Sequence, residues 1–263
     1  MAKLRNMDED GRRLASLYDA HHRRHPEDLD FWLDLAGRYG DPVLELGCGT
    51  GRVMVPLAQA GHTIFGLDRD KAMLQVLKER LNRRPVANLH FFQGEATCFN
   101  LAQKFGLILF PCNTYSTLAE AERAKCLKRV RGHLTPGGAF VASTVNPQVV
   151  FDLPQSSYTE VEEIFPDPES DDPIQASSSW ERRRNLFHVS WHYDRLMENG
   201  EVERVTLRIT HELKDVSGYL EEMEQCGLKP VAVYGDFDFS PYEPDSPYLI
   251  MIAAVETGEE RIA

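Results

Sequence analysis

Three glycines, Gly47, Gly49 and Gly51, follow the short apolar run that begins at Val43. Glycine tolerates a positive φ and has no Cβ, so a ligand can approach the backbone of such a loop closely. If the loop opens a helix, the free amides of the helix N-terminus favour a polar or anionic group. Arg52 stands where a Gly-x-Gly-x-x-Gly dinucleotide motif would carry glycine or alanine, and this departure argues against a pyrophosphate ligand.

Asp68 ends the next apolar run, 17 residues after Gly51. A carboxylate at the end of the second strand can accept hydrogen bonds from both hydroxyls of a ribose. Asp68 could instead be the N-cap of the helix that is predicted to follow it. The glycine loop at this spacing favours the ribose role.

Apolar runs and amphipathic segments alternate along the middle of the chain, and the alternation favours a parallel sheet with helices on both faces. Strands are predicted at residues 43–46, 63–67, 89–92, 107–110 and 139–145, with helices at 53–60, 71–81 and 119–133. A turn is predicted over Thr135-Pro-Gly-Gly138. Towards the C-terminus, a helix at 217–226 and strands at 231–234 and 249–255 are predicted to complete the sheet.

Two other regions have different patterns. The first forty residues are amphipathic and helical, with a break at His25-Pro26. Residues 154–175 are predicted to form a loop, and the next apolar residues alternate with polar ones around Asn199-Gly200, a strong hairpin signal. We therefore predict an N-terminal helical cap (1–40), an α/β domain (41–153 and 212–263) and an inserted antiparallel β subdomain (154–211).

The segment Leu44–Gly51 resembles motif I of the class I S-adenosylmethionine-dependent methyltransferases, and Gly66-Leu-Asp68 resembles their second motif. Gln93-Gly-Glu-Ala96 is similar to the adenine site of that family, and Tyr18-Asp19 is similar to its N-terminal cap. The inserted strands resemble a small-molecule subset, in which they cover the active site. The resemblance implies a Rossmann-like seven-stranded sheet of order 3-2-1-4-5-7-6, with strand 7 antiparallel, and S-adenosyl-L-methionine as cofactor. The cofactor-binding residues that it implies are Tyr18, Glu45, Gly47, Cys48, Gly49, Gly51, Asp68, Arg69, Met73, Glu95, Ala96 and Phe110.

The implied reaction moves a methyl group to a nitrogen or oxygen atom of a small-molecule acceptor by in-line displacement. Alignment of the acceptor and exclusion of water can supply most of the catalysis, and a general base is needed only if the acceptor is protonated. The catalytic residues are therefore unassigned. Five candidates follow the fourth strand or lie on the insertion: Asn113, Tyr115, His192, Arg208 and His211. Each could equally be a hydrogen-bonded structural residue, and Cys48 is interpreted as a small space-filling residue rather than a nucleophile.

Composition excludes several other classes of partner. The net charge of −12 disfavours nucleic acid, and Arg182, Arg183 and Arg184, the one compact basic patch, are interpreted as a strand end. No apolar run reaches the ~20 residues of a membrane span, and no secretory signal begins the chain. Five cysteines without a Cys-x-x-Cys pair indicate no metal site, no disulfides and a cytoplasmic protein. An NAD-dependent oxidoreductase and a non-catalytic S-adenosylmethionine-binding protein are the alternatives, and the acceptor and the oligomeric state are not predicted.

Overall fold

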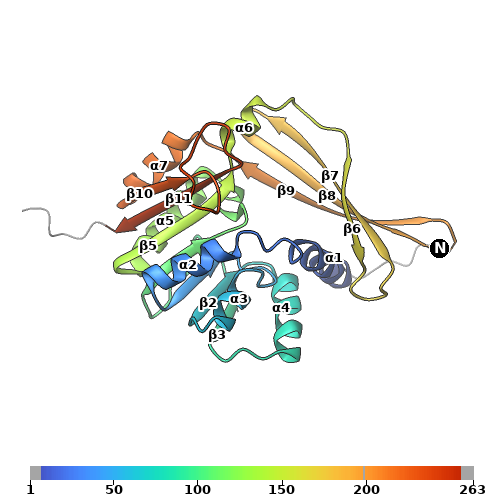
Figure 1. Cartoon of the computed structure of the whole chain (residues 1–263), viewed down its shortest axis with the longest axis horizontal. Helices are drawn as coiled ribbons and strands as arrows, with labels where there is room; N and C mark the ends of the chain where they lie inside the picture. The colour runs from blue at the N-terminus through green and yellow to red at the C-terminus, as the bar shows by residue number, and fades with distance from the viewer. Residues whose placement is uncertain (1–6, 198, 256–263) are drawn as a thin grey trace, which may run out of the picture.

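The computed structural model describes residues 7–197 and 199–255, which form two β-sheets and their covering helices (Figure 1). The larger sheet has seven strands in the order β10-β11-β5-β4-β1-β2-β3. Its strands are β1 (Val43–Leu46), β2 (Ile64–Asp68), β3 (Leu89–Gln93), β4 (Phe105–Phe110), β5 (Leu134–Val145), β10 (Leu228–Tyr234) and β11 (Tyr248–Val255). The first five pair in parallel, whereas β11 is antiparallel to both β5 and β10. The predicted strand order and the antiparallel seventh strand are confirmed.

Helices cover both faces of this sheet, because neighbouring residues of its central strands point to opposite sides. Leu107 and Leu109 of β4 pack with one apolar cluster, and Ile108 and Phe110 pack with the other. The first cluster is closed by α2 (Leu29–Tyr39), α3 (Met54–Gln59) and α4 (Lys71–Arg83), and the second by α5 (Glu120–His133) and α7 (Val216–Gln225). Each fully buried Leu, Val, Ile or Phe side chain contributes roughly 1.5–3 kcal/mol to this core.

The smaller sheet is antiparallel and has the order β6-β7-β8-β9. Its strands are β6 (Glu160–Pro166), β7 (Pro173–Arg183), β8 (Leu186–Leu196) and β9 (Val202–Glu212). The predicted hairpin at Asn199-Gly200 joins β8 to β9, and Gly200 has a φ of 82°. The prediction of a loop over residues 154–175 was wrong, because it contains β6 and the start of β7. β6 is an edge strand with mostly exposed side chains, so it lacks the apolar alternation that marks a half-buried strand.

The predicted turn at Thr135–Gly138 is instead an irregular part of β5. Leu134 pairs with Phe105 and Ala139 pairs with Leu107, so the intervening residues bulge opposite Gly106. A Cβ on Gly138 would lie 2.9 Å from the carbonyl oxygen of Gly106. Gly138 therefore permits β5 to lie close to β4. The same Thr-Pro-Gly-Gly pattern is also typical of a turn, so the local sequence does not distinguish the two structures.

Helix α1 (Met7–His22) lies between α4 and the four-stranded sheet (Figure 1). Leu17 of α1 packs with Phe165, Ile174 and Tyr193 of that sheet. Arg13 donates a hydrogen bond of 2.7 Å to the fully buried carboxylate of Asp167. Two short helices, η1 (Thr114–Thr117) and α6 (Pro147–Asp152), follow β4 and β5. None of the helices among the described residues is long and apolar enough to cross a membrane.

Candidate active site

The glycine loop leaves β1 with positive φ angles of 70° at Gly47, 51° at Gly49 and 83° at Gly51. A Cβ on Gly47 would lie 2.5 Å from Cγ2 of Thr114, and one on Gly51 would lie 2.6 Å from Cδ1 of Leu77. The missing Cβ at Gly47 lets η1 lie close to the loop, and the missing Cβ at Gly51 lets α4 lie close to it. Both the backbone conformation and the space around it therefore require glycine at these two positions.

Asp68 lies directly beside the glycine loop. Its carboxylate accepts hydrogen bonds from the amides of Gly49, at 2.7 Å, and Asp70, at 2.8 Å. Burial raises the pKa of Asp68, and these two amides oppose the shift. The N-cap of α4 is Asp70, which accepts from the amides of Ala72 and Met73. The alternative role of Asp68 as an N-cap was therefore wrong, and its side chain is directed towards the loop.

A cavity of about 240 Å³, called here the first cavity, lies against the glycine loop and Asp68. Eight of the twelve predicted cofactor-binding residues line it: Tyr18, Glu45, Gly47, Cys48, Gly49, Asp68, Arg69 and Met73. Of the other four, Gly51 packs on α4 and Phe110 is buried in the core. Glu95 and Ala96 follow β3, where the amide of Gly94 donates to the carbonyl of Asp68 at 2.9 Å. Their adenine-binding role stays a prediction.

Glu45 is a buried carboxyl group in the wall of the first cavity, and it is only 2% exposed. Its Oε2 atom has no hydrogen-bond partner within the described part of the chain. Burial raises the pKa of Glu45 well above its usual range. A buried carboxyl oxygen without a partner is costly, so this atom fits a ligand that brings a donor such as an ammonium group. Cys48, also buried, has a raised pKa and stays a neutral thiol, as expected for a space-filling residue.

A second cavity, of about 330 Å³, adjoins the first. The two share six lining residues: Tyr18, His22, Arg52, Cys112, Ile209 and His211. The apolar part of its wall comes from the four-stranded sheet, from β5 and from the segment that leads into β11: Val145, Phe187, Val189, Trp191, Ile209, Phe237 and Tyr248. A molecule in the second cavity would therefore face one in the first across this shared boundary.

Arg52 places a cation at the boundary between the cavities. Its guanidinium pairs with both carboxylate oxygens of Asp28, at 2.6 and 2.5 Å, and Trp32 donates a third hydrogen bond to Asp28 at 2.9 Å. This network ties the end of the glycine loop to the start of α2. Bidentate pairs of this kind fix geometry as well as charge, so Arg52 and Asp28 hold the loop in place.

Two histidines, the half-buried His22 and the buried His211, also lie at this boundary. Burial lowers the pKa of His22 to about 3 and that of His211 to about 4, so both rings are neutral at pH 7. Nδ1 of His22 lies 3.2 Å from the carbonyl oxygen of Tyr18, to which it donates. Nδ1 of His211 lies 2.9 Å from Oγ of Ser116, whose own proton is donated to the Asn113 carbonyl. In both rings the proton is therefore assigned to Nδ1, and Nε2 is left as an acceptor.

Of the five predicted catalytic candidates, Asn113 and His211 line the second cavity. The other three line neither of the two cavities. Tyr115 is fully buried between Phe110, Phe140 and Tyr219. His192 and Arg208 lie on the strand face opposite to Trp191, Leu207 and Ile209, because side chains alternate along β8 and β9. The register of the hairpin, which the sequence did not settle, decides which histidine reaches the cavity.

Sequence reasoning missed several residues of this site: His22, Asp28, Arg52, Cys112, Thr114 and Trp191. His22 follows Tyr18 by one helical turn, and its ring stacks on that of Tyr18 at 3.9 Å between centroids. That spacing is a signal that could have been used, since residues at i and i+4 share a helix face. Arg52 was noted only as a departure from a dinucleotide motif.

Known proteins resemble this chain in sequence and in fold. A family model described as a methyltransferase domain matches residues 43–138. The cypemycin N-terminal methyltransferase of a Streptomyces species is 32% identical over 110 residues, which cover 41% of this chain and 43% of that protein. The chain thus spans less than half the length of this curated relative.

Two solved structures match nearly the whole chain. The CcbJ methyltransferase from Streptomyces caelestis has a TM-score of 0.71 at 23% identity, covering 97% of this chain and 94% of its own. S-adenosylmethionine-bound CalS10, an amino pentose methyltransferase from Micromonospora echinaspora, has a TM-score of 0.70 at 18% identity, covering 91% and 97%. The family match therefore places a methyltransferase domain at residues 43–138, which contain the glycine loop and Asp68, and the structural matches show that the chain shares the fold of these methyltransferases.

Proposed function

We propose that the protein transfers the methyl group of S-adenosylmethionine to an amine nitrogen of a small molecule held in the second cavity. The observation that carries the proposal is the boundary between the two cavities, where the neutral rings of His22 and His211 present acceptor atoms. S-adenosylmethionine supplies a methyl group that is already activated by its positive sulfur. The protein therefore has to hold the cofactor, align the acceptor and exclude water.

The first cavity offers the groups that hold the cofactor. Asp68 is placed to accept hydrogen bonds from the ribose hydroxyls, in exchange for its present contact with the amide of Gly49. Glu45 provides the unpartnered acceptor that the ammonium of the methionine part requires. Gly47 and Gly49 expose backbone that a side chain would cover.

The second cavity favours an amine over an acidic acceptor. Its charged lining groups include Glu27, Asp28 and Arg52, while two of its three histidines, His22 and His211, are neutral. A neutral amine can donate an N–H to Nε2 of either ring. This hydrogen bond turns the lone pair of the amine nitrogen away from the ring. Because their pKa values are so low, the two imidazoles do not protonate the amine and so leave it nucleophilic. The apolar wall of Trp191 and Phe187 suits the carbon skeleton of a small molecule.

Two of the proteins compared above are named for nitrogen-bearing acceptors, an N-terminus for the cypemycin enzyme and an amino pentose for CalS10. These names support an amine acceptor and a small molecule or peptide end rather than nucleic acid. We also propose that the protein acts in the cytoplasm, where its five free cysteines would stay reduced.

The proposal is tested by incubating the protein with S-adenosylmethionine labelled in its methyl group and a panel of paired acceptors. Each pair contains an amino sugar or a short peptide and the same molecule with a hydroxyl in place of the amine. We expect label in the amine members at rates at least tenfold above those of the hydroxyl members. Preferential labelling of the hydroxyl members would replace the proposal with O-methylation. Tight cofactor binding without transfer to any acceptor would identify a non-catalytic binding protein.

A further inference from the structure

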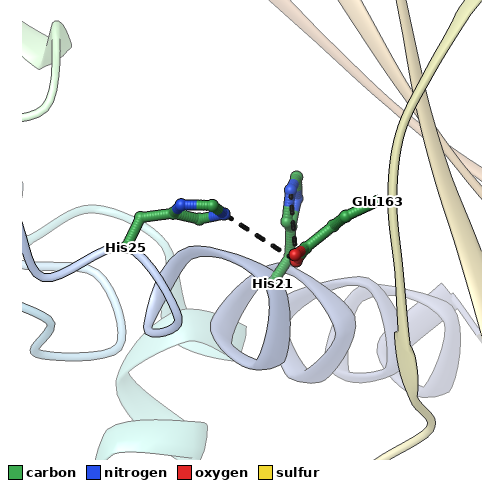
Figure 2. Close-up of side chains that lie close together, drawn as sticks. All are labelled: His21, His25 and Glu163. Atoms are coloured by element: carbon green, nitrogen blue, oxygen red, sulfur yellow. Dashed lines mark ion pairs between the residues drawn. The ribbon is translucent and has the colours of Figure 1, made fainter.

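Three potential metal ligands meet at the edge of the N-terminal region, beside the second cavity, whose lining includes one of them, His25. Figure 2 shows His21 at the end of α1, His25 in the connection to α2 and Glu163 on β6 with their side chains directed towards one another. Nε2 of each histidine lies 3.8 Å from Oε1 of Glu163. All three ligand atoms lie within 4.8 Å of one another. The cluster therefore offers two imidazole nitrogens and one carboxylate oxygen around one point.

The electronic state of these groups suits a cation. Nδ1 of His21 lies 3.2 Å from the hydroxyl of Tyr193, so that contact can hold the Nδ1 proton and leave the Nε2 lone pair free. Oε1 of Glu163 is inaccessible to solvent and accepts no hydrogen bond from the described residues. A carboxylate oxygen in this state is stabilised by a positive partner.

The spacing is close to that of a coordination sphere. Ligand atoms of a tetrahedral zinc ion, at about 2.0–2.1 Å from the metal, lie roughly 3.4 Å apart. The two distances of 3.8 Å exceed this value by only a few tenths of an ångström. Because His25 lies in an exposed connection between helices, its side chain can supply that adjustment.

We propose that His21, His25 and Glu163 bind a divalent first-row transition-metal cation of the zinc type, which ties the N-terminal helices to the four-stranded sheet. Mixed imidazole and carboxylate ligands suit such cations, and water completes their coordination. His25 also lines the second cavity, so the metal would stabilise the wall of that cavity. The inference does not depend on the acceptor proposed above, because it rests on the geometry of these three side chains and on no step of the methyl transfer.

Arg24 provides a competing contact. Its Nε lies 3.6 Å from the same Glu163 oxygen, where it neutralises the carboxylate when no metal is bound. The Arg24 side chain is 50% exposed, so it can move into solvent when a cation takes its place. Metal and guanidinium thus compete for one oxygen, and removal of the guanidinium should strengthen metal binding.

The experiment is titration of the metal-free full-length protein with Zn²⁺ by calorimetry, and with Co²⁺ by its visible absorption. We expect one site per chain. His25→Ala and Glu163→Gln should weaken it at least tenfold, and Tyr193→Phe, which removes the contact to His21, should weaken it ~10–100-fold. Arg24→Ala should bind at least threefold more tightly. Thermal unfolding without metal confirms that each variant folds.

The matched control is His62→Ala, because His62 pairs with Asp41 at 2.9 Å and belongs to no cluster of three possible metal ligands among the described residues. It should leave the affinity unchanged. Absence of a one-to-one site in the unmodified protein would overturn the proposal. Equal losses in the His62 and His25 variants would also overturn it, since they would indicate scattered surface binding. The methyltransfer assay is separate, so failure of the amine proposal would leave this result intact.

Discussion

The two adjoining cavities are built in different ways. Half of the residues that line the first lie in one stretch of chain, from Glu45 to Met73, and its central element is backbone. The second is formed by side chains from α1, the α1–α2 connection, β5, β8, β9 and the segment before β11. A site made of local backbone can keep its function with few constraints on distant segments. A site made of distant side chains can change its ligand by single substitutions, while the fold and the cofactor site stay the same.

The cavities also differ in charge. The first contains the carboxyl groups of Glu45 and Asp68, which suit the ammonium and the hydroxyls of the cofactor. The neutral imidazoles of His22 and His211 line both cavities at their boundary, whereas the apolar wall of Phe187, Val189 and Trp191 belongs to the second alone. We therefore expect substitutions in the first cavity to change cofactor binding, and substitutions in the apolar wall of the second to change which acceptor is selected.

The largest effect is expected where the backbone of the first cavity is changed. Gly47→Val places a β-branched side chain at a φ of 70° and within 2.5 Å of Thr114. We expect binding of S-adenosylhomocysteine to weaken about 100-fold, equivalent to about 2.8 kcal/mol. Gly37→Val in α2 is the control, because among the described residues a Cβ there meets no atom within 4 Å beyond its chain neighbours and the nearby backbone of its own helix. Unchanged affinity in the Gly47 variant, measured by calorimetry, would show that the loop backbone does not shape the cavity.

The second cavity should dominate the pH dependence of stability. His211 has a pKa of about 4 in the folded protein, against an unperturbed value of 6.5, because it is buried. Between these values the unfolded chain binds the additional proton, so stability falls as pH decreases from about 6.5 and levels off below about 4. For this residue the loss is about 2 kcal/mol at pH 5 relative to pH 7.5. His211→Asn, which keeps a donor towards Ser116, should reduce the loss by that amount in urea unfolding.

Exposed His90, on β3, supplies the control for this measurement. His90→Asn should leave the difference in unfolding free energy between pH 7.5 and pH 5 within ~0.5 kcal/mol of the unmodified protein. If His211→Asn behaves in the same way as His90→Asn, the ring of His211 is accessible to protons in the folded state. The second cavity would then lack its neutral acceptor.

A smaller effect is expected from the side chain at the end of β2. Asp68→Ala should weaken binding of S-adenosylhomocysteine at least tenfold, about 1.4 kcal/mol, because two ribose hydroxyls lose their shared acceptor. Asp70→Asn preserves the N-cap of α4 and should change the affinity less than twofold. Equal affinities of the Asp68 variant and the unmodified protein, in the same calorimetric titration, would remove Asp68 from the cofactor site.

The contrast between a cavity built on local backbone and one built from distant side chains also explains what could be predicted from the sequence. The strand order and the placement of Gly47 and Gly49 beside Asp68 follow from local patterns, since loop glycines and strand ends leave signals within a few residues. The second cavity depends on the register of β8 and β9, where a shift of one residue would exchange Trp191 for His192. The prediction chose His192 and Arg208 because of their chemistry, and the pleat directs both away from the cavity. β6 was missed because an edge strand with exposed acidic residues has no apolar period.

That register gives the most selective test of the second cavity. Trp191 lines it, whereas His192 lies on the other face of β8, where Nδ1 contacts Thr206 Oγ1 at 2.9 Å. Trp191→Ala should raise the KM of the most rapidly methylated amine about tenfold, because the apolar wall loses its largest side chain. Binding of S-adenosylhomocysteine should change less than twofold, because Trp191 does not line the first cavity. His192→Ala should leave both values unchanged, and a raised KM in that variant alone would place the acceptor on the opposite face of the four-stranded sheet.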